Sequence, residues 1–179
     1  MALPDLRGRR ALVLGAETAL GEELARVLAE AGARLALISA TAAAEPSFRV
    51  KRLGRRLASG TAAPPVVQAI DAANEMAVRV MCRQVAKEMG GLDLLFFCAD
   101  LGAATPEALR LAARYGGREM RRQGGGVIVV AGPALELSGL REELEAAGLR
   151  LVAVTVAGEG EERRWAVERA LALAAGAGD

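Results

Sequence analysis

One turn near the start of the chain has the residue types and spacing needed to hold a phosphate group. It reads Leu14-Gly15-Ala16-Glu17-Thr18-Ala19-Leu20-Gly21, and it lies between an apolar run and a helically periodic segment. An apolar strand that enters a glycine-containing turn and opens a helix presents the free amides of the helix N-terminus to an anion. The pattern therefore predicts a site for a dinucleotide pyrophosphate, with candidate residues Gly15, Thr18, Ala19, Leu20 and Gly21.

Alternating apolar runs and helical patterns predict the elements that position this turn. We expect strands at 10–15, 34–39, 66–70, 93–98, 126–131 and 150–156, each apolar throughout, as strands covered on both faces are. We expect helices at 19–31, 47–59, 73–89, 106–122, 135–147 and 160–176. The alternation predicts a doubly wound parallel sheet in three layers, α/β/α, whose ligands lie at the carboxyl ends of the strands.

Composition limits the classes of function. A chain of 179 residues with 53% hydrophobic content can bury one core, so we expect a single domain over 1–179. The 23 basic and 22 acidic residues nearly cancel, which argues against nucleic acid or an anionic membrane as a partner. Charge appears before any apolar run and no stretch is long enough to span a bilayer, so we expect a cytoplasmic protein. The absence of His and of Cys-x-x-Cys spacing predicts no metal site.

Further motifs follow the turn in a fixed order along the chain. They are Gly32-Ala33-Arg34-Leu35-Ala36-Leu37, Asp71, Gly91-Leu92-Asp93-Leu94-Leu95, the segment 120–130 with its glycine run, and Ala147-Gly148-Leu149-Arg150-Leu151-Val152. Together with residues 9–21 they resemble the short-chain dehydrogenase/reductase family almost from end to end. The resemblance implies strand order 3-2-1-4-5-6, an NAD(P) site that also includes Ser39, Asp71 and Ala99, and, in active members, a catalytic Ser, a Tyr-x-x-x-Lys pair and a supporting Asn.

The chain departs from the family's pattern at the catalytic positions. Gly132-Pro133-Ala134 stand where the resemblance places the Ser, and the link from Gly132 to Arg150 is too short for the usual Tyr and long helix. The other residue types occur elsewhere, as the only Tyr, the only two Lys and the only Asn: Tyr115, Lys51, Lys87 and Asn74. Reduction of a carbonyl needs an acid for the developing alkoxide, and a phenol serves only beside a cation. We therefore predict no catalytic residue and no activity for the chain alone.

The cofactor positions depart as well. Ala19 replaces the middle glycine of the turn, which adds a methyl group where the pyrophosphate approaches the backbone. Glu17 and Asp100 place two carboxylates near that dianion, Asp100 replacing the glycine of the family's Asn-Asn-Ala-Gly. Ser39-Ala40-Thr41 offers neither an acid for ribose hydroxyls nor an Arg for a 2′-phosphate. These residues predict that NAD(P) binding is weak or lost.

The roles of Asp71, of a group of cations and of Tyr115 each have two possible interpretations. Asp71 either contacts adenine or caps a helix that begins near Ala73, and the cap is the favoured interpretation. The cations Arg49, Lys51, Arg52, Arg55 and Arg56 either fold back onto a phosphate or form a solvated helix face, and the solvated face is favoured. Tyr115 is either a general acid or a packing residue, and packing is favoured because Glu119 stands where the cation should be.

The resemblance also implies an assembly. In that family the helices before the fifth and sixth strands pack against their symmetry mates, and here these are 106–122 and 135–147. Two mid-helix glycines, Gly116 and Gly117, each cost about 1 kcal/mol relative to Ala, so a close helix contact is expected to compensate. One face collects Leu109, Ala112, Ala113, Gly116 and Met120, and it packs either on a second chain or on the sheet. We expect a homodimer or a heteromer with a similar chain.

Three functions from different classes remain. The favoured hypothesis is a catalytically degenerate, family-like structural or regulatory subunit. The alternatives are an NAD(P)-binding oxidoreductase completed by a partner, and a dinucleotide-sensing module that binds without turnover. The missing tetrad disfavours the oxidoreductase, and the altered turn disfavours the sensor.

Overall fold

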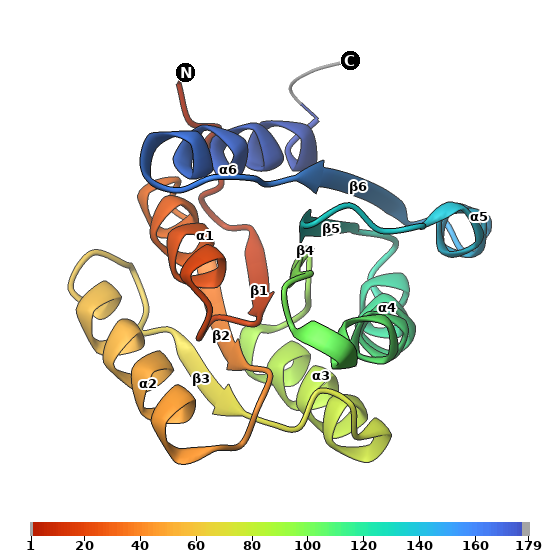
Figure 1. The fold of residues 1–179 in the computed structure, drawn as a ribbon, viewed down its shortest axis with the longest axis horizontal. Helices are drawn as coiled ribbons and strands as arrows, with labels where there is room; N and C mark the ends of the chain where they lie inside the picture. Colours follow the sequence, from red (N-terminus) through yellow and green to blue (C-terminus); the bar gives the residue numbers. More distant parts are fainter. Residues whose placement is uncertain (1, 177–179) are drawn as a thin grey trace.

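A computed structural model describes residues 2–176 and shows a six-stranded parallel sheet in the order β3-β2-β1-β4-β5-β6 (Figure 1). The strands are β1 (Arg10–Leu14), β2 (Arg34–Ser39), β3 (Val66–Ala69), β4 (Leu94–Cys98), β5 (Val127–Gly132) and β6 (Arg150–Thr155). The helices are α1 (Ala19–Glu30), α2 (Ala44–Ala58), α3 (Glu75–Met89), α4 (Thr105–Arg122), α5 (Ser138–Ala146) and α6 (Gly160–Ala174), with a 3₁₀ turn at Gly102–Ala104. The predicted doubly wound fold and its strand order are confirmed.

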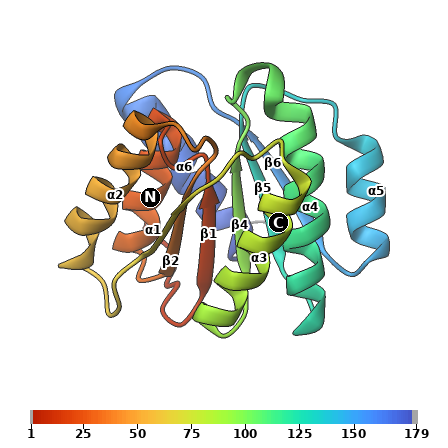
Figure 2. The same cartoon turned by 90° about the horizontal axis from the view of Figure 1, so that it is seen from below.

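The helices cover the sheet in two layers (Figure 2). Helices α1, α2 and α6 lie on one face, and α3, α4 and α5 lie on the other. Alternate residues of each strand enter the two cores: Val13 and Phe96 pack toward α1 and α6, whereas Leu12 and Leu95 pack toward α3 and α4. The central strands are buried on both faces, which explains why they read as unbroken apolar runs.

The order of the strands reverses between β1 and β4, and the candidate site lies at this point. Leu14, the last residue of β1, pairs with Ile38 of β2 on one side and with Phe97 of β4 on the other. The turn after β1 and the residues after β4 therefore meet at the carboxyl edge of the sheet. In open α/β sheets this crevice is where ligands bind.

A polar clamp holds β1 and β4 together at the opposite edge. The Arg10 backbone N–H and its Nε both donate to Asp93 Oδ2 at 2.8 Å, and Arg10 Nη2 donates to Gln123 Oε1 at 2.9 Å. Asp93 precedes β4 and Gln123 follows α4. The clamp fixes the register of the two strands that carry the candidate site.

Three predicted helix starts are wrong, each for a local reason. Helix α2 begins at Ala44 rather than 47 and includes Pro46, which a first turn accepts because its N–H would have no partner. Helix α5 begins at Ser138 rather than 135, because the Glu136 carboxylate accepts hydrogen bonds from Ser138 N and Oγ. The favoured role of Asp71 as a cap is also wrong: α3 begins at Glu75 with Asn74 as its cap, accepting from Ala77 N at 3.0 Å.

The small-residue face of α4 packs on the chain's own sheet. A Cβ added to Gly116 would lie 2.4 Å from Leu95 Cδ1 of β4, and one added to Gly117 would lie 2.9 Å from Leu149 Cδ1. Leu109, Ala112, Ala113 and Met120 belong to the same buried core. The close approach that these glycines predicted is therefore made within one chain. Across residues 2–176, no helix combines the length and the apolar character that a membrane crossing requires.

Candidate functional site

The turn after β1 has the geometry that its sequence predicts. Gly15 has φ 94°, a left-handed conformation that favours glycine, and a Cβ there would lie 2.8 Å from Cys98 Cβ. The Thr18 hydroxyl donates to Gly15 O at 2.8 Å and accepts from Gly21 N at 3.0 Å, so Thr18 caps α1. The chain thus passes from β1 into α1 through a tight turn that Thr18 closes.

Two amides remain available at the start of α1. Thr18 uses the N–H of Gly21, and Glu22 N donates to Thr18 O at 2.9 Å. Within residues 2–176, no hydrogen bond engages the N–H groups of Ala19 and Leu20. These two amides and the positive end of the helix dipole could receive a phosphate oxygen.

Gly21 is required by packing whether or not a ligand binds. A Cβ at this position would lie 2.0 Å from Gly15 O and 2.7 Å from Ala16 Cα, and neither backbone atom can move aside. The helix start must press directly on the turn. The presence of glycine at position 21 is therefore explained by packing and is not evidence that a dinucleotide binds.

Glu17 fills part of the crevice from within. It is only 9% exposed, and its carboxylate oxygens accept from Ala40 N at 3.1 and 3.2 Å. Arg49 Nη1 of α2 donates to Glu17 O at 2.9 Å, and Arg49 Nη2 contacts Glu45 at 2.8 Å. Of the five cations weighed for a return toward the turn, Arg49 is the one that makes this contact. Its guanidinium group bonds to the Glu17 carbonyl oxygen and does not lie free in the crevice.

The electrostatics of the crevice disfavour an anion. Burial raises the pKa of Glu17, and the nearby charge of Asp100 adds to the shift while Arg49 opposes it. Desolvation of its carboxyl group also raises the pKa of Asp100, although the residue is exposed over part of its surface. A pyrophosphate placed near these two acids meets like charge whenever they are ionised.

The other predicted cofactor residues follow the neighbouring strands. Ser39 ends β2, is fully buried and donates its hydroxyl to Thr41 O at 2.7 Å. Ala99 follows β4, and its N–H donates to Ala131 O of β5 at 2.8 Å. Asp71 follows β3, and its Oδ1 accepts from Ala73 N at 3.0 Å in a local turn. The structure thus brings all of them to one edge of the sheet, where the Ser39 hydroxyl and Asp71 Oδ1 already have partners within the chain.

Leu101 is a residue of the crevice that sequence reasoning missed. Its Cδ2 lies 3.5 Å from the position that a Cβ on Gly15 would take, so this side chain closes on the turn from the β4 side. Its N–H donates to Thr105 Oγ1 at 3.0 Å, which anchors the short turn before α4. A single apolar residue in a loop gives no signal in sequence, because its partner becomes a neighbour only once β1 and β4 pair.

Tyr115 lies in the helical layer, as a packing residue. It is 6% exposed on α4, and its hydroxyl donates to Glu75 Oε1 of α3 at 2.5 Å. The guanidinium groups of Arg114 and Arg118 lie 5.4 and 5.2 Å from the centre of its ring. The hydrogen bond to Glu75 raises the pKa of Tyr115, which makes the phenol a poorer proton donor. No Lys contacts it among the described residues.

The cysteines offer no nucleophile. Cys82 and Cys98 are both buried, and burial raises the pKa of Cys82 to about 12 and that of Cys98 still further. A thiol held in its neutral form is a weak nucleophile and a weak metal ligand. The part of the chain that the structure describes also contains no group of three or more potential metal ligands.

Comparisons with known proteins agree with the fold. A family model described as short chain dehydrogenase matches residues 9–115. A short-chain type dehydrogenase/reductase from Mycobacterium marinum is 21% identical and superposes with a TM-score of 0.77 over 95% of this chain and 89% of its own. A hydroxysteroid dehydrogenase from Escherichia coli is 16% identical, with a TM-score of 0.75 over 94% and 90%. A short chain dehydrogenase from Burkholderia cenocepacia J2315, in complex with NADP, is 25% identical, with a TM-score of 0.67 over 84% and 74%. The search of curated proteins gave no match.

Proposed function

Because the chain belongs to the short-chain dehydrogenase family, we propose that it serves as a non-catalytic structural or regulatory member of that family. The observation that carries the proposal is the place of Tyr115. This is the only Tyr of the chain, and it is buried between α3 and α4 with its hydroxyl on Glu75. Lys51 and Lys87 lie on α2 and on the last turn of α3, so neither follows Tyr115 on its helix. The cations beside the Tyr115 ring are Arg114 and Arg118, and its hydroxyl is bonded to the Glu75 carboxylate, so this phenol lacks the Lys partner with which the family protonates an alkoxide.

We also propose that NAD(P) binds weakly or not at all. One relative holds NADP, and the free amides of Ala19 and Leu20 suit a phosphate. Three features oppose it: the ionisable pair Glu17 and Asp100, the methyl group of Ala19, and the lack of an acid or Arg after β2. These residues do not fit the dinucleotide.

The test combines a titration with an activity panel. We expect NAD⁺ and NADP⁺ to show no saturable binding at micromolar concentrations by calorimetry, and no alcohol or carbonyl to turn over above background. Tyr115→Phe serves as the matched variant because it removes only the hydroxyl that contacts Glu75. Turnover that Tyr115→Phe abolishes would overturn the proposal and make Tyr115 a catalytic residue.

Two alternatives remain as outcomes of the same test. Sub-micromolar binding without turnover would support a dinucleotide-sensing module, for which the free amides of Ala19 and Leu20 are the favourable observation. Turnover that appears only after a second protein is added would support an oxidoreductase completed by a partner.

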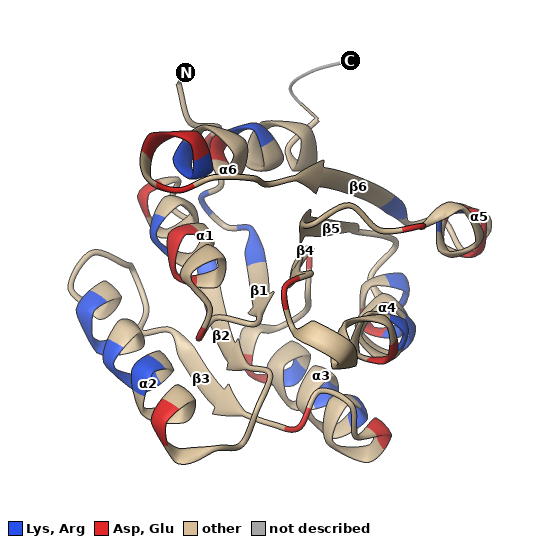
Figure 3. Cartoon of the chain, viewed as in Figure 1, with Lys and Arg blue, Asp and Glu red and all other residues tan. Residues whose placement is uncertain are grey.

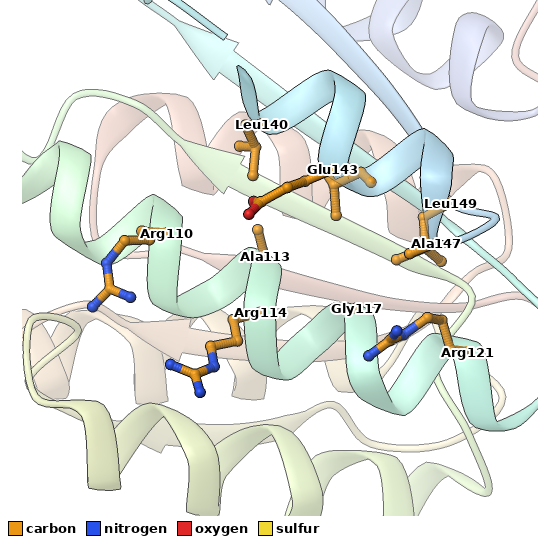
Figure 4. Close-up of a pocket in the computed structure, with 10 residues that line it drawn as sticks. Arg110, Ala113, Arg114, Gly117, Arg121, Leu140, Glu143, Ala147 and Leu149 are labelled. Carbon is orange, nitrogen blue, oxygen red and sulfur yellow. The ribbon is translucent and has the colours of Figure 1, made fainter. Parts of the chain in front are cut away.

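Assembly through α4 and α5 is the second part of the proposal. The two helices form a groove of about 440 Å³, with a floor of small and apolar residues that includes Ala113, Gly117 and Leu144 (Figure 4). On α4 it is rimmed by Arg110, which pairs with Glu107, by Arg114, which pairs with Glu75, and by Arg121; on α5 it is rimmed by the acidic Glu143. A groove with one basic and one acidic wall is complementary to its own copy turned by a two-fold axis, which supports a homodimer or a heteromer with a similar chain.

Charge reversal tests this interface. We expect Arg121→Glu or Glu143→Arg alone to weaken association about tenfold, and the two together to restore part of it, because the pair would meet across the axis. Light scattering over a dilution series measures the effect. Arg79→Glu, an exposed cation on α3, is the control. If neither Arg121→Glu nor Glu143→Arg weakens association, the result would count against this groove.

A further inference from the structure

The outer face of α2 carries one aromatic residue and three cations in a row. Phe48, Lys51, Arg52 and Arg55 stand at positions i, i+3, i+4 and i+7, which place them on one side of the helix. All four are exposed, Phe48 over 56% of its surface, whereas the buried residues of α2 lie on the opposite side. We call these four residues the α2 stripe.

Two other cations of α2 are held by the chain itself. Arg49 Nη2 contacts a Glu45 carboxylate oxygen at 2.8 Å, and Arg56 Nη2 pairs with a Glu22 carboxylate oxygen at 3.3 Å. Glu45 is the only acidic residue of α2. The acids that α2 contacts are therefore used by Arg49 and Arg56, and they do not neutralise the stripe.

The cations of the α2 stripe have no acidic partner of their own. Within residues 2–176, Lys51 and Arg55 make no hydrogen bond or ion pair with a side chain. The guanidinium carbon of Arg52 lies 5.4 Å from the centre of the Phe48 ring, so the two side chains form one cationic and aromatic surface. Figure 3 shows the cations along the outer side of α2, with an acidic residue at the start of the helix. A cluster of positive charges without acids attracts carboxylates.

A groove lies beside the stripe. Its volume is about 250 Å³, and it is lined by Lys51 and Arg55 on the side of α2 and by Pro64-Pro65 and Val67 on the side of β3. A Cβ added to Gly54 would lie 2.7 Å from Val67 Cγ2, so α2 packs tightly on β3 there. Pockets for whole small molecules usually measure about 300–1,000 Å³, so this smaller groove suits a single apolar side chain.

We propose that the α2 stripe and this groove bind an acidic segment of a partner protein. Carboxylates of the segment pair with Lys51, Arg52 and Arg55, and one apolar side chain enters the groove beside Pro64-Pro65. The uncompensated positive charge sets the sign of the partner. The hollow shape favours a peptide over a membrane, because a flat bilayer surface cannot fill a groove. Arg and aromatic residues are also enriched at protein interfaces.

This surface is separate from the other sites of the chain. Helix α2 lies beside β3 at one edge of the sheet, whereas α5 lies beside β6 at the other (Figure 1). None of its residues lines the groove between α4 and α5 or belongs to the turn from Gly15 to Gly21. Binding of an acidic segment requires neither a dinucleotide nor association through α4 and α5, so its outcome is independent of the proposed function.

Charge reversal on the stripe tests the proposal. The probe is a fluorescently labelled peptide of glutamates with one leucine at its centre, and the same peptide with glutamines is the uncharged reference. We expect fluorescence anisotropy to show saturable binding of the acidic peptide to the full chain, weakening as salt is added. Lys51→Glu with Arg55→Glu should weaken this binding at least about tenfold. Both side chains are exposed, so the fold should tolerate the change.

Arg79→Glu with Arg83→Glu is the matched control. These two cations lie on α3, are exposed, and have the same spacing of four residues as Lys51 and Arg55, so the net charge changes equally. Because α3 lies on the other face of the sheet and salt screens distant charges, the affinity should stay within about twofold of that of the parent. An equal loss in the two double variants would mean that only net charge matters, and it would overturn the proposal.

Phe48→Ser tests the aromatic part of the stripe. We expect it to weaken binding of the acidic peptide about fivefold, because the peptide loses an apolar contact and Arg52 loses the ring beside it. Met76→Ser, at a residue 62% exposed on α3, is the control and should leave the affinity unchanged. Replacing the leucine of the peptide by glycine should weaken binding to a similar degree.

Three results would contradict the proposed surface. The first is the absence of saturable binding of the acidic peptide, and the second is equal binding of the glutamine peptide. The third is binding of the parent to phosphatidylserine vesicles without binding to the peptide, which would make the stripe a membrane surface instead.

Discussion

Gly21→Ala should destabilise the protein by about 3 kcal/mol or more, the largest effect of any single methyl group added at the candidate site. The added Cβ would lie 2.0 Å from Gly15 O and 2.7 Å from Ala16 Cα, so the turn and the first turn of α1 must separate. Such a loss corresponds to a fall in Tm of about 6–12 °C for a chain of this size. Thermal unfolding followed by circular dichroism measures it, with no ligand added.

Gly139→Ala is the matched control, because the same substitution lies near the start of another helix. A Cβ on Gly139 would meet nothing within 4 Å, and α5 should gain up to about 1 kcal/mol from the better helix former. The two variants should therefore shift Tm in opposite directions. A mild effect of Gly21→Ala would mean that packing does not require this glycine, and its presence would again speak for a bound pyrophosphate.

Sequence predicted those parts of the fold that depend on local pattern. Helix α1 begins at Ala19 as expected, because the Thr18 hydroxyl caps it by accepting from Gly21 N. Helix α5 begins three residues later than expected, because the carboxylate of Glu136 holds Ser138 through both N and Oγ. Apolar periodicity cannot reveal such a contact, since Leu137 and Leu140 continue the helical spacing into the loop.

In the candidate site, too, the features within consecutive residues could be predicted, whereas contacts between distant segments could not. The turn from Gly15 to Gly21 was predictable, since its chemistry lies within seven consecutive residues. The contact of Arg49 with Glu17 O joins α2 to the turn, and Leu101 reaches Gly15 only because β4 lies beside β1. Contacts of this kind join residues far apart in the sequence, so they cannot be predicted from local patterns without the tertiary fold. Asp71 was predicted to cap α3, but its carboxylate closes a local turn onto Ala73 N and Asn74 caps the helix instead.

Neutralising the two carboxylates should raise dinucleotide affinity by at least about tenfold. Two unit charges about 8 Å apart at an effective dielectric constant of about 40 interact by about 1 kcal/mol, and the pyrophosphate carries two charges against each acid. Glu17→Gln keeps an oxygen for Ala40 N, Asp100→Gly restores the glycine of the family pattern, and Ala19→Gly removes the methyl group from the turn. Calorimetric titration of Glu17→Gln with Asp100→Gly at low ionic strength measures the gain with NAD⁺, and addition of Ala19→Gly measures the further effect of the methyl group.

The pH dependence of the same titration separates charge from shape. The pKa of both Glu17 and Asp100 is raised, so each begins to take up a proton at a higher pH than an ordinary carboxyl group does. Repulsion is complete above these raised pKa values and disappears as the pH falls through them, so the affinity of the unaltered chain for NAD⁺ should rise as the pH is lowered from neutral into the acidic range. Glu17→Gln with Asp100→Gly should be flat over the same range. If the unaltered chain shows no such rise, and the paired substitutions add no affinity, then the carboxylates are not what opposes the dinucleotide, and the methyl group of Ala19 or the side chain of Leu101 must account for it.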